Sequence, residues 1–227
     1  MDYEMKKAGS GTELASLYLK RYEKAKTIRQ KWEGLFQECY EYALPMRETF
    51  YSQTIGERRD DKIFDETAVV GVQEFASRLQ SGLVPNFARW ADFTSGSEIP
   101  PEQRDAINNE LDEVTDYVFE VLQNSNFSQE VHESFMDLAV GTGVIHVSEG
   151  DAIHPVKFSA LPLPHVVLDV GPDDSIDHVY RERSLRYSEI PVVYPKAKLS
   201  NEIKEAIEKN PEGKTKVLEV VCRNYTK

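Results

Sequence analysis

Cysteine is scarce in this sequence, and long apolar runs are missing from it. Cys39 and Cys222 are the two cysteines among 227 residues, and their wide separation suits reduced thiols in a cytosolic setting better than a disulfide framework. No apolar stretch approaches the roughly 20 residues that a membrane span needs. The first residues, MDYEMKKAGSGTE, have no apolar core after their lysines, so we expect neither a secretory signal nor a membrane partner.

Basic residues are almost missing from one long segment. Between Glu98 and Asp151 the sequence has 13 acidic residues and one basic residue, Arg104, and this segment alone accounts for the net charge of −12. The rest of the chain is balanced, with 26 basic and 26 acidic residues. A surface this acidic repels phosphate groups. It therefore argues against a tight nucleic-acid-binding face, but it is compatible with a protein that guides DNA without holding it.

The common enzyme motifs are missing as well. The sequence contains no GxxxxGK(S/T) phosphate loop, no GxGxxG after a predicted strand, no GxSxG nucleophile elbow and no HExxH. Its five histidines lack the spacing of metal ligands. The aspartates around Gly171 and Pro172 lack the spacing of a calcium loop and predict a hairpin turn instead. We therefore predict no catalytic residue, no cofactor and no metal site.

One helical stripe dominates the beginning of the chain. Its members recur at alternating steps of three and four residues, which is the period of one face of an α-helix, and all but Arg21 are apolar or aromatic. Pro45 ends the pattern because proline cannot donate the backbone hydrogen bond of a helix interior. We expect an amphipathic helix packed on its own domain; a coiled-coil partner is the alternative, although charged and aromatic residues interrupt the seam. The stripe consists of Leu14, Tyr18, Arg21, Ala25, Ile28, Trp32, Leu35, Cys39 and Tyr42.

Three further helices are predicted, over 65–83, 100–121 and 128–141. Asp65 supplies an N-cap signal for the first of them. Two successive prolines begin the second, at the one place in a helix where proline is tolerated. The acidic side chains of this second helix fall on its solvent side. The sequence Gly-Thr-Gly stops the third helix.

The pattern then changes to short strands separated by Gly, Pro and Asp turns. The sequence therefore predicts an α+β fold, in which long amphipathic N-terminal helices over 1–143 are followed by a small, mostly antiparallel β region over 144–227. Because the chain ends directly after a predicted strand, we expect a fragment of a longer protein. The predicted strands cover 144–147, 156–158, 166–168, 176–180 and 217–222, with a short helix over 201–209.

The aromatic side chains Trp32, Phe87 and Trp90 are expected to be core anchors. Arg89, which precedes Trp90, is expected to pair with an acid of the next helix. Taken alone, the residues indicate an α+β domain with a structural or assembly role.

Several short motifs occur together in one order over about residues 28–185. This order resembles that of the head-to-tail connecting proteins, or portal proteins, of short-tailed, T7-like bacteriophages. Each motif is loose by itself, but their succession is specific. The motifs are WE at 32–33, YALP at 42–45, IFDET at 63–67, FASRLQSGLVP at 75–85, RW at 89–90, GTGV at 141–144 and DHVYR at 177–181.

The resemblance implies a subunit of a ring, usually of twelve copies, at one capsid vertex, through which double-stranded DNA is packaged and ejected. It implies the capsid protein, the packaging terminase and tail adaptor proteins as partners. It also implies location in the virion, with assembly in the host cytoplasm. Catalysis would belong to the separate packaging motor, so we expect no enzyme activity in this chain.

The resemblance also suggests how the chain is organised. Residues 1–143 would form the helical part of the portal wing and 144–227 its β-rich part, before the stem, clip and crown begin. Since the DNA-facing residues of the family lie mostly in those later parts, no DNA-contacting residue is assigned here.

A ring of identical subunits needs two different, complementary faces on each copy. The acidic helix predicted over 100–121 and the mixed-charge first helix could supply them. Candidate subunit-interface residues are therefore Glu110, Asp112, Glu113 and Asp116.

Two alternatives remain at this point. A helical scaffold or interaction protein could share these motifs without having a role in a DNA channel; it would form a monomer or a small coiled-coil oligomer. A hydrolase with an unrecognised acid pair would contain a pocket in which two carboxylates have strongly shifted pKa values.

Overall fold

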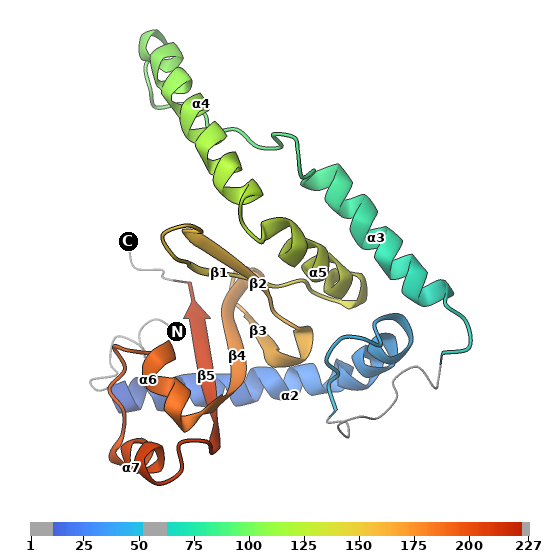
Figure 1. The fold of residues 1–227 in the computed structure, drawn as a ribbon, viewed down its shortest axis with the longest axis vertical. Helices are drawn as coiled ribbons and strands as arrows, with labels where there is room; N and C mark the ends of the chain where they lie inside the picture. The colour runs from blue at the N-terminus through green and yellow to red at the C-terminus, as the bar shows by residue number, and fades with distance from the viewer. Residues whose placement is uncertain (1–10, 52–62, 224–227) are drawn as a thin grey trace. The chain divides into compact units, whose positions relative to one another are not determined.

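The computed structural model describes residues 11–51 and 63–223 (Figure 1). By its internal contacts the chain divides into two compact units. One unit comprises the residues up to Trp32 together with those from His165 onward, and we call it the sheet unit. The other runs from Glu33 to Pro164, and we call it the helical unit. Each is described by itself.

The first long helix, α2, runs over Gly11–Ala43 and contributes residues to both units. Its predicted end before Pro45 is confirmed. Of the predicted stripe, Ala25 is the buried member; the buried tyrosines of α2, Tyr22 and Tyr40, lie next to the stripe and not in it. The prediction that Trp32 is a core anchor is wrong, since this residue is 57% exposed and lies between the two buried sections of the helix.

The sheet unit is built on three antiparallel strands in the order β3-β4-β5. They cover Val166–Val170, Ile176–Arg186 and Lys214–Cys222. The predicted hairpin turn between β3 and β4 is confirmed, with Asp174 at a left-handed φ of 57°. Tyr22 and Ala25 of α2 pack against Val167 and Tyr180 to form the core of this unit.

Short helical elements connect β4 to β5. A 3₁₀ turn, η2, over Tyr187–Glu189 runs directly into α6, over Ile190–Val193, and neither was predicted. The predicted last helix is confirmed as α7, over Asn201–Lys209. Its N-cap is Ser200, whose hydroxyl oxygen accepts a hydrogen bond from the backbone N–H of Ile203.

The helical unit contains α3, over Thr67–Leu83, α4, over Pro101–Gln123, and α5, over Phe127–Val140. Helices α3 and α5 lie side by side (Figure 1). The N-cap of α3 is Glu66 and not the predicted Asp65, but Asp65 lies directly before it and its Oδ1 accepts a hydrogen bond of 2.7 Å from the backbone N–H of Thr67. A hairpin of β1, over Ile145–Glu149, and β2, over Val156–Ala160, packs on α5.

The core of the helical unit joins the end of α2 to the segment after β2. Tyr40, Leu44 and Leu163 are its buried members. The short 3₁₀ turn η1, over Leu163–His165, follows β2 and supplies Leu163. Together with the strands of the sheet unit, this arrangement confirms the α+β class. No helix of the described residues is long and apolar enough to cross a membrane.

Phe87 does not fulfil its predicted role. It lies in the segment between α3 and α4, where its side chain is 95% exposed, so it is not a core anchor. Trp90 is also partly exposed, but it packs edge-on against Phe119 and stacks on Phe127, with ring centroids 5.3 and 6.1 Å away. Of the three predicted anchors, Trp90 is therefore the one that packs in an aromatic cluster.

Candidate subunit interface

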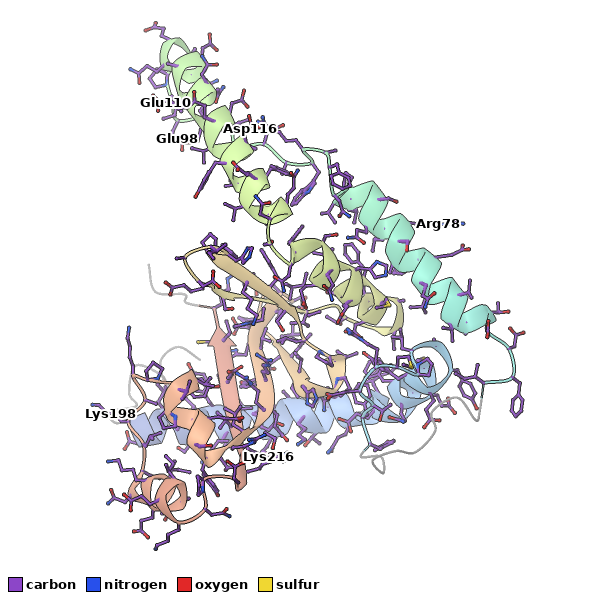
Figure 2. All side chains as sticks on the ribbon, in the orientation of Figure 1. Arg78, Glu98, Glu110, Asp116, Lys198 and Lys216 are labelled. Carbon is purple, nitrogen blue, oxygen red and sulfur yellow. The ribbon has the colours of Figure 1, made fainter. Side chains whose placement is uncertain are left out.

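Helix α4 carries half of the acidic excess of the chain. It contains seven acidic residues and one basic residue, Arg104. Thr115 and Phe119 are its buried positions. All four predicted interface residues lie on α4 and are exposed, as expected of a solvent-facing acidic helix. Figure 2 shows Glu110 and Asp116 on this helix.

Two of the four predicted residues pair within the chain. The guanidinium of Arg89 donates a hydrogen bond of 3.0 Å to Asp116 Oδ1 and a second hydrogen bond to Asp112 Oδ1. It also forms an ion pair with Asp92 in its own segment. The hydrogen bond to Asp112 is the main reason that the pKa of Arg89 is raised. The prediction that Arg89 pairs with an acid of the next helix is thus confirmed.

The segment that carries Arg89 is also held against α4 by two further hydrogen bonds. The backbone N–H of Phe93 donates to Thr115 Oγ1 at 3.2 Å. The backbone N–H of Ser95 donates to Asn108 Oδ1 at 2.9 Å. This segment therefore covers the side of α4 on which Asp112 and Asp116 lie.

The adjacent side of α4 is open. Glu110 and Glu113 are exposed and form no ion pair with any described residue. Glu120 shares their side of the helix, because positions i, i+3 and i+10 fall within one face. Between these carboxylates, Val114 is 49% and Tyr117 is 64% exposed. We call Glu110, Glu113, Val114, Tyr117 and Glu120 the outer face of α4.

The 3.6-residue period places the four residues on neighbouring parts of the helix surface. Asp112 and Asp116 are four residues apart, Glu110 and Glu113 are three apart, and Glu113 and Asp116 are also three apart. What distinguishes the four residues is their pairing with Arg89. It divides them into an internally paired set and an open set.

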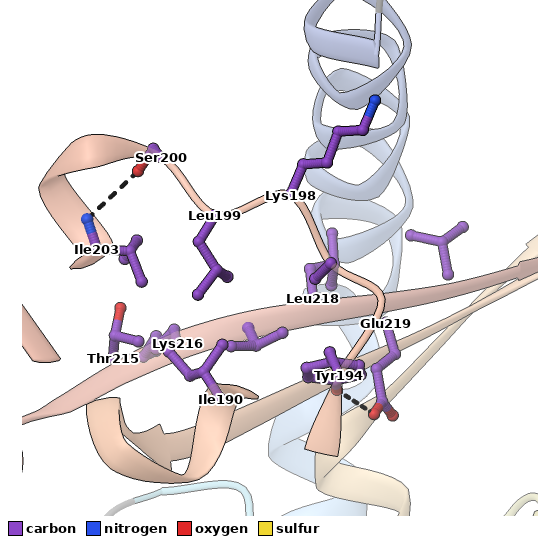
Figure 3. A pocket seen from close by; sticks show the side chains of 13 residues that line it. Ile190, Tyr194, Lys198, Leu199, Ser200, Ile203, Thr215, Lys216, Leu218 and Glu219 are labelled. Atoms are coloured by element: carbon purple, nitrogen blue, oxygen red, sulfur yellow. Dashed lines mark hydrogen bonds between the residues drawn. The ribbon is translucent and has the colours of Figure 1, made fainter. Parts of the chain in front are cut away.

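The sheet unit contains a cleft of about 560 Å³ beside β5 (Figure 3). One wall is residues 215–220 of the strand, and the other is formed by Ile190, Tyr194, Leu199 and Ile203. Leu199 and Ile203 point toward the strand in this view. We call this site the β5 cleft.

One carboxylate, Glu219, lines the β5 cleft, and its charge is compensated. Arg183 donates to it at 3.0 Å and Arg181 at 3.3 Å, and the Tyr194 hydroxyl donates as well. Burial alone would raise the pKa of Glu219, but the hydrogen bonds from Tyr194 and Arg183 outweigh this effect and lower it. Glu219 therefore remains ionised and held between cations.

Next to the cleft, Lys216 pairs with Glu182 on the neighbouring strand. The hydrogen bond from Lys216 is the largest cause that lowers the pKa of Glu182, to about 2. Lys198 is exposed and has no ion pair with a described residue. Among the residues that line the β5 cleft, the two lysines Lys198 and Lys216 thus outnumber the single carboxylate, Glu219.

Sequence comparison supplies the identity that geometry alone does not. Residues 15–227 match the family model described as bacteriophage head to tail connecting protein. The chain belongs to this family. The resemblance drawn from the short motifs is thereby confirmed over nearly the whole connector chain.

One curated relative of the connector chain is named probable portal protein and comes from Bordetella phage BPP-1. The two are 23% identical over 198 residues, which is 85% of this chain. The chain spans 35% of the length of that relative.

The hydrolase alternative predicted a pocket with two carboxylates. Neither of the two clefts described in the connector chain has this arrangement. The β5 cleft has Glu219 alone, and a smaller cleft of about 170 Å³ next to Trp90, Phe119 and Phe127 is lined by no carboxylate. Among the residues that the structure describes, no three His, Cys, Asp or Glu side chains are grouped so that they could hold a metal ion.

A buried carboxylate that no sequence motif indicated does occur elsewhere in the connector chain. Asp137 of α5 is completely buried and accepts hydrogen bonds from Tyr40 and Arg47. Arg47 also donates to Glu133 at 2.7 Å. Since a guanidinium and a hydroxyl satisfy this carboxylate, the arrangement is that of a structural ion pair.

Proposed function

We propose that this chain is part of a phage portal subunit, and that copies of it form a ring of twelve at one capsid vertex. Double-stranded DNA passes through such a ring during packaging and during ejection. The single observation that carries the proposal is the family match over residues 15–227. The printed name of the phage relative, probable portal protein, supports it.

The charge of the chain fits this role. A sliding polyanion requires a surface that does not bind phosphate strongly, and a net charge of −12 disfavours such binding. The proposed partners are the capsid protein, the packaging terminase, tail adaptor proteins and the DNA itself. The proposed location is the virion, with assembly in the host cytoplasm. ATP hydrolysis is assigned to the motor, and this chain has no catalysis of its own.

Within the subunit, residues 1–143 and 144–227 are proposed to be the helical and β-rich parts of the wing. Glu110, Asp112, Glu113 and Asp116 are proposed to serve the subunit interface in two ways. Asp112 and Asp116 hold the segment around Arg89 on α4. Glu110 and Glu113 remain available to a neighbouring copy.

The proposal is tested by measuring the size of the assembly that the complete protein containing this chain forms. Native mass spectrometry and negative-stain electron microscopy are expected to show closed rings of about twelve copies. A stable monomer or dimer at micromolar concentration would instead support the helical scaffold protein. A phage that lacks the gene is expected to assemble no DNA-filled heads, and normal filling would contradict a portal role.

A further inference from the structure

The position of the β5 cleft makes it accessible to another chain. Successive side chains of a strand point to opposite faces of its sheet. Because all six residues from 215 to 220 line the cleft, it runs along the edge of β5 and not over one face. The strand order places β5 at the edge of the three-stranded sheet, where one row of its backbone groups has no neighbouring strand among the described residues.

The lining of the β5 cleft suits an amphipathic, acidic occupant. Leu199, Ile203 and Leu218 provide apolar contact area. The basic side chains around the cleft outnumber its carboxylates, and Lys198 and Lys216 are both exposed. Both lysines belong to the sheet unit and are labelled in Figure 2. Positive potential beside an apolar slot favours a partner that carries carboxylates next to apolar side chains.

The outer face of α4 has this composition. Val114 and Tyr117 are about half or more exposed, and Glu110, Glu113 and Glu120 surround them with negative charge that no described residue neutralises. Tyrosine is among the residues most often found as an anchor in protein interfaces. The outer face of α4 and the β5 cleft are therefore complementary both in charge and in apolar character.

We propose that the outer face of α4 of one copy docks into the β5 cleft of the next copy. Tyr117 and Val114 enter the apolar slot, while Glu113 and its neighbours approach Lys198 and Lys216. The contact joins two different surfaces, as a closed ring requires. This inference rests on the proposed ring function and names the surfaces that build it.

Cross-linking in trans tests the contact directly. In a background with Cys39→Ser and Cys222→Ser, one tagged copy carries Glu113→Cys and a second, differently tagged copy carries Lys198→Cys. Mixed under mild oxidation, the two are expected to form a disulfide-linked dimer that contains both tags. The matched control pairs Glu113→Cys with Arg78→Cys, an exposed position on α3, and should give at least tenfold less product. Equal yields, or linkage only between two Glu113→Cys copies, would overturn the proposal.

Charge reversal in the complete protein provides the second test. Glu113→Lys and Lys198→Glu are each expected to reduce the yield of rings at least tenfold, and the double variant is expected to restore it. Arg78→Glu serves as the control and should assemble normally. Normal assembly of both single variants would overturn this inference while leaving the portal function intact. If the unmodified protein forms no ring at all, the proposed function fails, whereas the mixed cross-link still reports on the contact itself.

Discussion

The Tyr40 hydroxyl donates a hydrogen bond of 2.7 Å to Asp137 Oδ1, and both residues are completely buried. Arg47 binds the same carboxylate through two guanidinium nitrogens. Burial, followed by the charge of Asp137, raises the pKa of Tyr40. This group of three side chains joins the end of α2 and the segment after it to α5, within the helical unit.

Removal of one partner of this ion pair should be costly. Arg47→Met leaves the Asp137 carboxylate buried with a hydroxyl as its main partner. We expect the free energy of unfolding to fall by about 3–5 kcal/mol, because an uncompensated charge is left in the interior. Urea denaturation followed by circular dichroism measures the change. The control Tyr40→Phe removes one hydrogen bond and should cost about 1–3 kcal/mol; a smaller loss for Arg47→Met than for Tyr40→Phe would refute this interpretation.

Arg89 should stabilise its segment locally and the whole chain only slightly. Its ion pairs with Asp112 and Asp116 lie at the surface, where solvent screens them. We expect Arg89→Gln to accelerate hydrogen exchange at the amides of Phe93 and Ser95, which bond to α4, while the urea midpoint stays nearly constant. Arg78→Gln, which removes an exposed pair within α3, should leave the exchange at both amides unchanged. Unaltered exchange in Arg89→Gln would show that the arginine does not hold the segment.

His178 should make stability depend on pH. Its ring is buried, and Arg21 Nη1 lies 2.9 Å from its Nε2. Burial first, and then the charge of Arg21, lower the pKa of His178, although Asp177 and Asp169 act in the opposite direction. The folded protein therefore keeps this ring neutral, whereas the unfolded chain takes up a proton below a pH of about 6.5.

The sign of the effect follows from this difference. Stability is fully present above a pH of about 6.5 and is lost as the pH falls through the lowered pKa of the folded state. Urea unfolding between pH 5 and pH 7.5 should show the decline. His178→Gln should flatten it, and His146→Gln, at an exposed site on β1, should not. An identical slope in all three proteins would assign the pH dependence to other groups.

Replacement of two glycines by alanine should change the stability of the protein in opposite directions. At Gly143 an added Cβ would lie 2.5 Å from the backbone oxygen of Ser134, which cannot move without disturbing α5. Gly143→Ala should therefore destabilise the protein by about 1–3 kcal/mol. At Gly34, within α2, a Cβ meets nothing within 4 Å. Gly34→Ala should stabilise it by about 0.5–1 kcal/mol through better helix propensity. The midpoint of thermal unfolding, compared with that of the unmodified protein, distinguishes the two variants. A lower midpoint for Gly34→Ala would contradict the expectation that a methyl group fits at this position without a clash.

Local signals explain what the sequence could predict. Ser200 caps α7, and Asp65 bonds to the first residue of α3, because their side chains reach amides two or three residues away, and such contacts depend on neighbouring positions alone. The pairing of Arg89 with α4 was predictable because the next helix presents acids at nearly every turn. The acidic helix itself was evident from composition.

Long-range burial explains what the sequence could not predict. Nothing adjacent to Asp137 distinguishes it from the exposed acids of α4, because its burial depends on Arg47, which is 90 residues earlier in the chain. Phe87 and Trp32 were placed in a core for their size alone, yet both side chains are exposed. The η2 and α6 turns were missed because they are too short for a helical period to be visible.

The division of the chain also affects the order of folding during synthesis. The first half of α2 leaves the ribosome early, but Val167 and Tyr180, which cover Tyr22 and Ala25, emerge only after the entire helical unit. Until then the apolar stripe of the nascent helix is unshielded, and an unshielded stripe is prone to aggregation and attractive to chaperones. The helical unit can fold before the strands of the sheet unit have been synthesised.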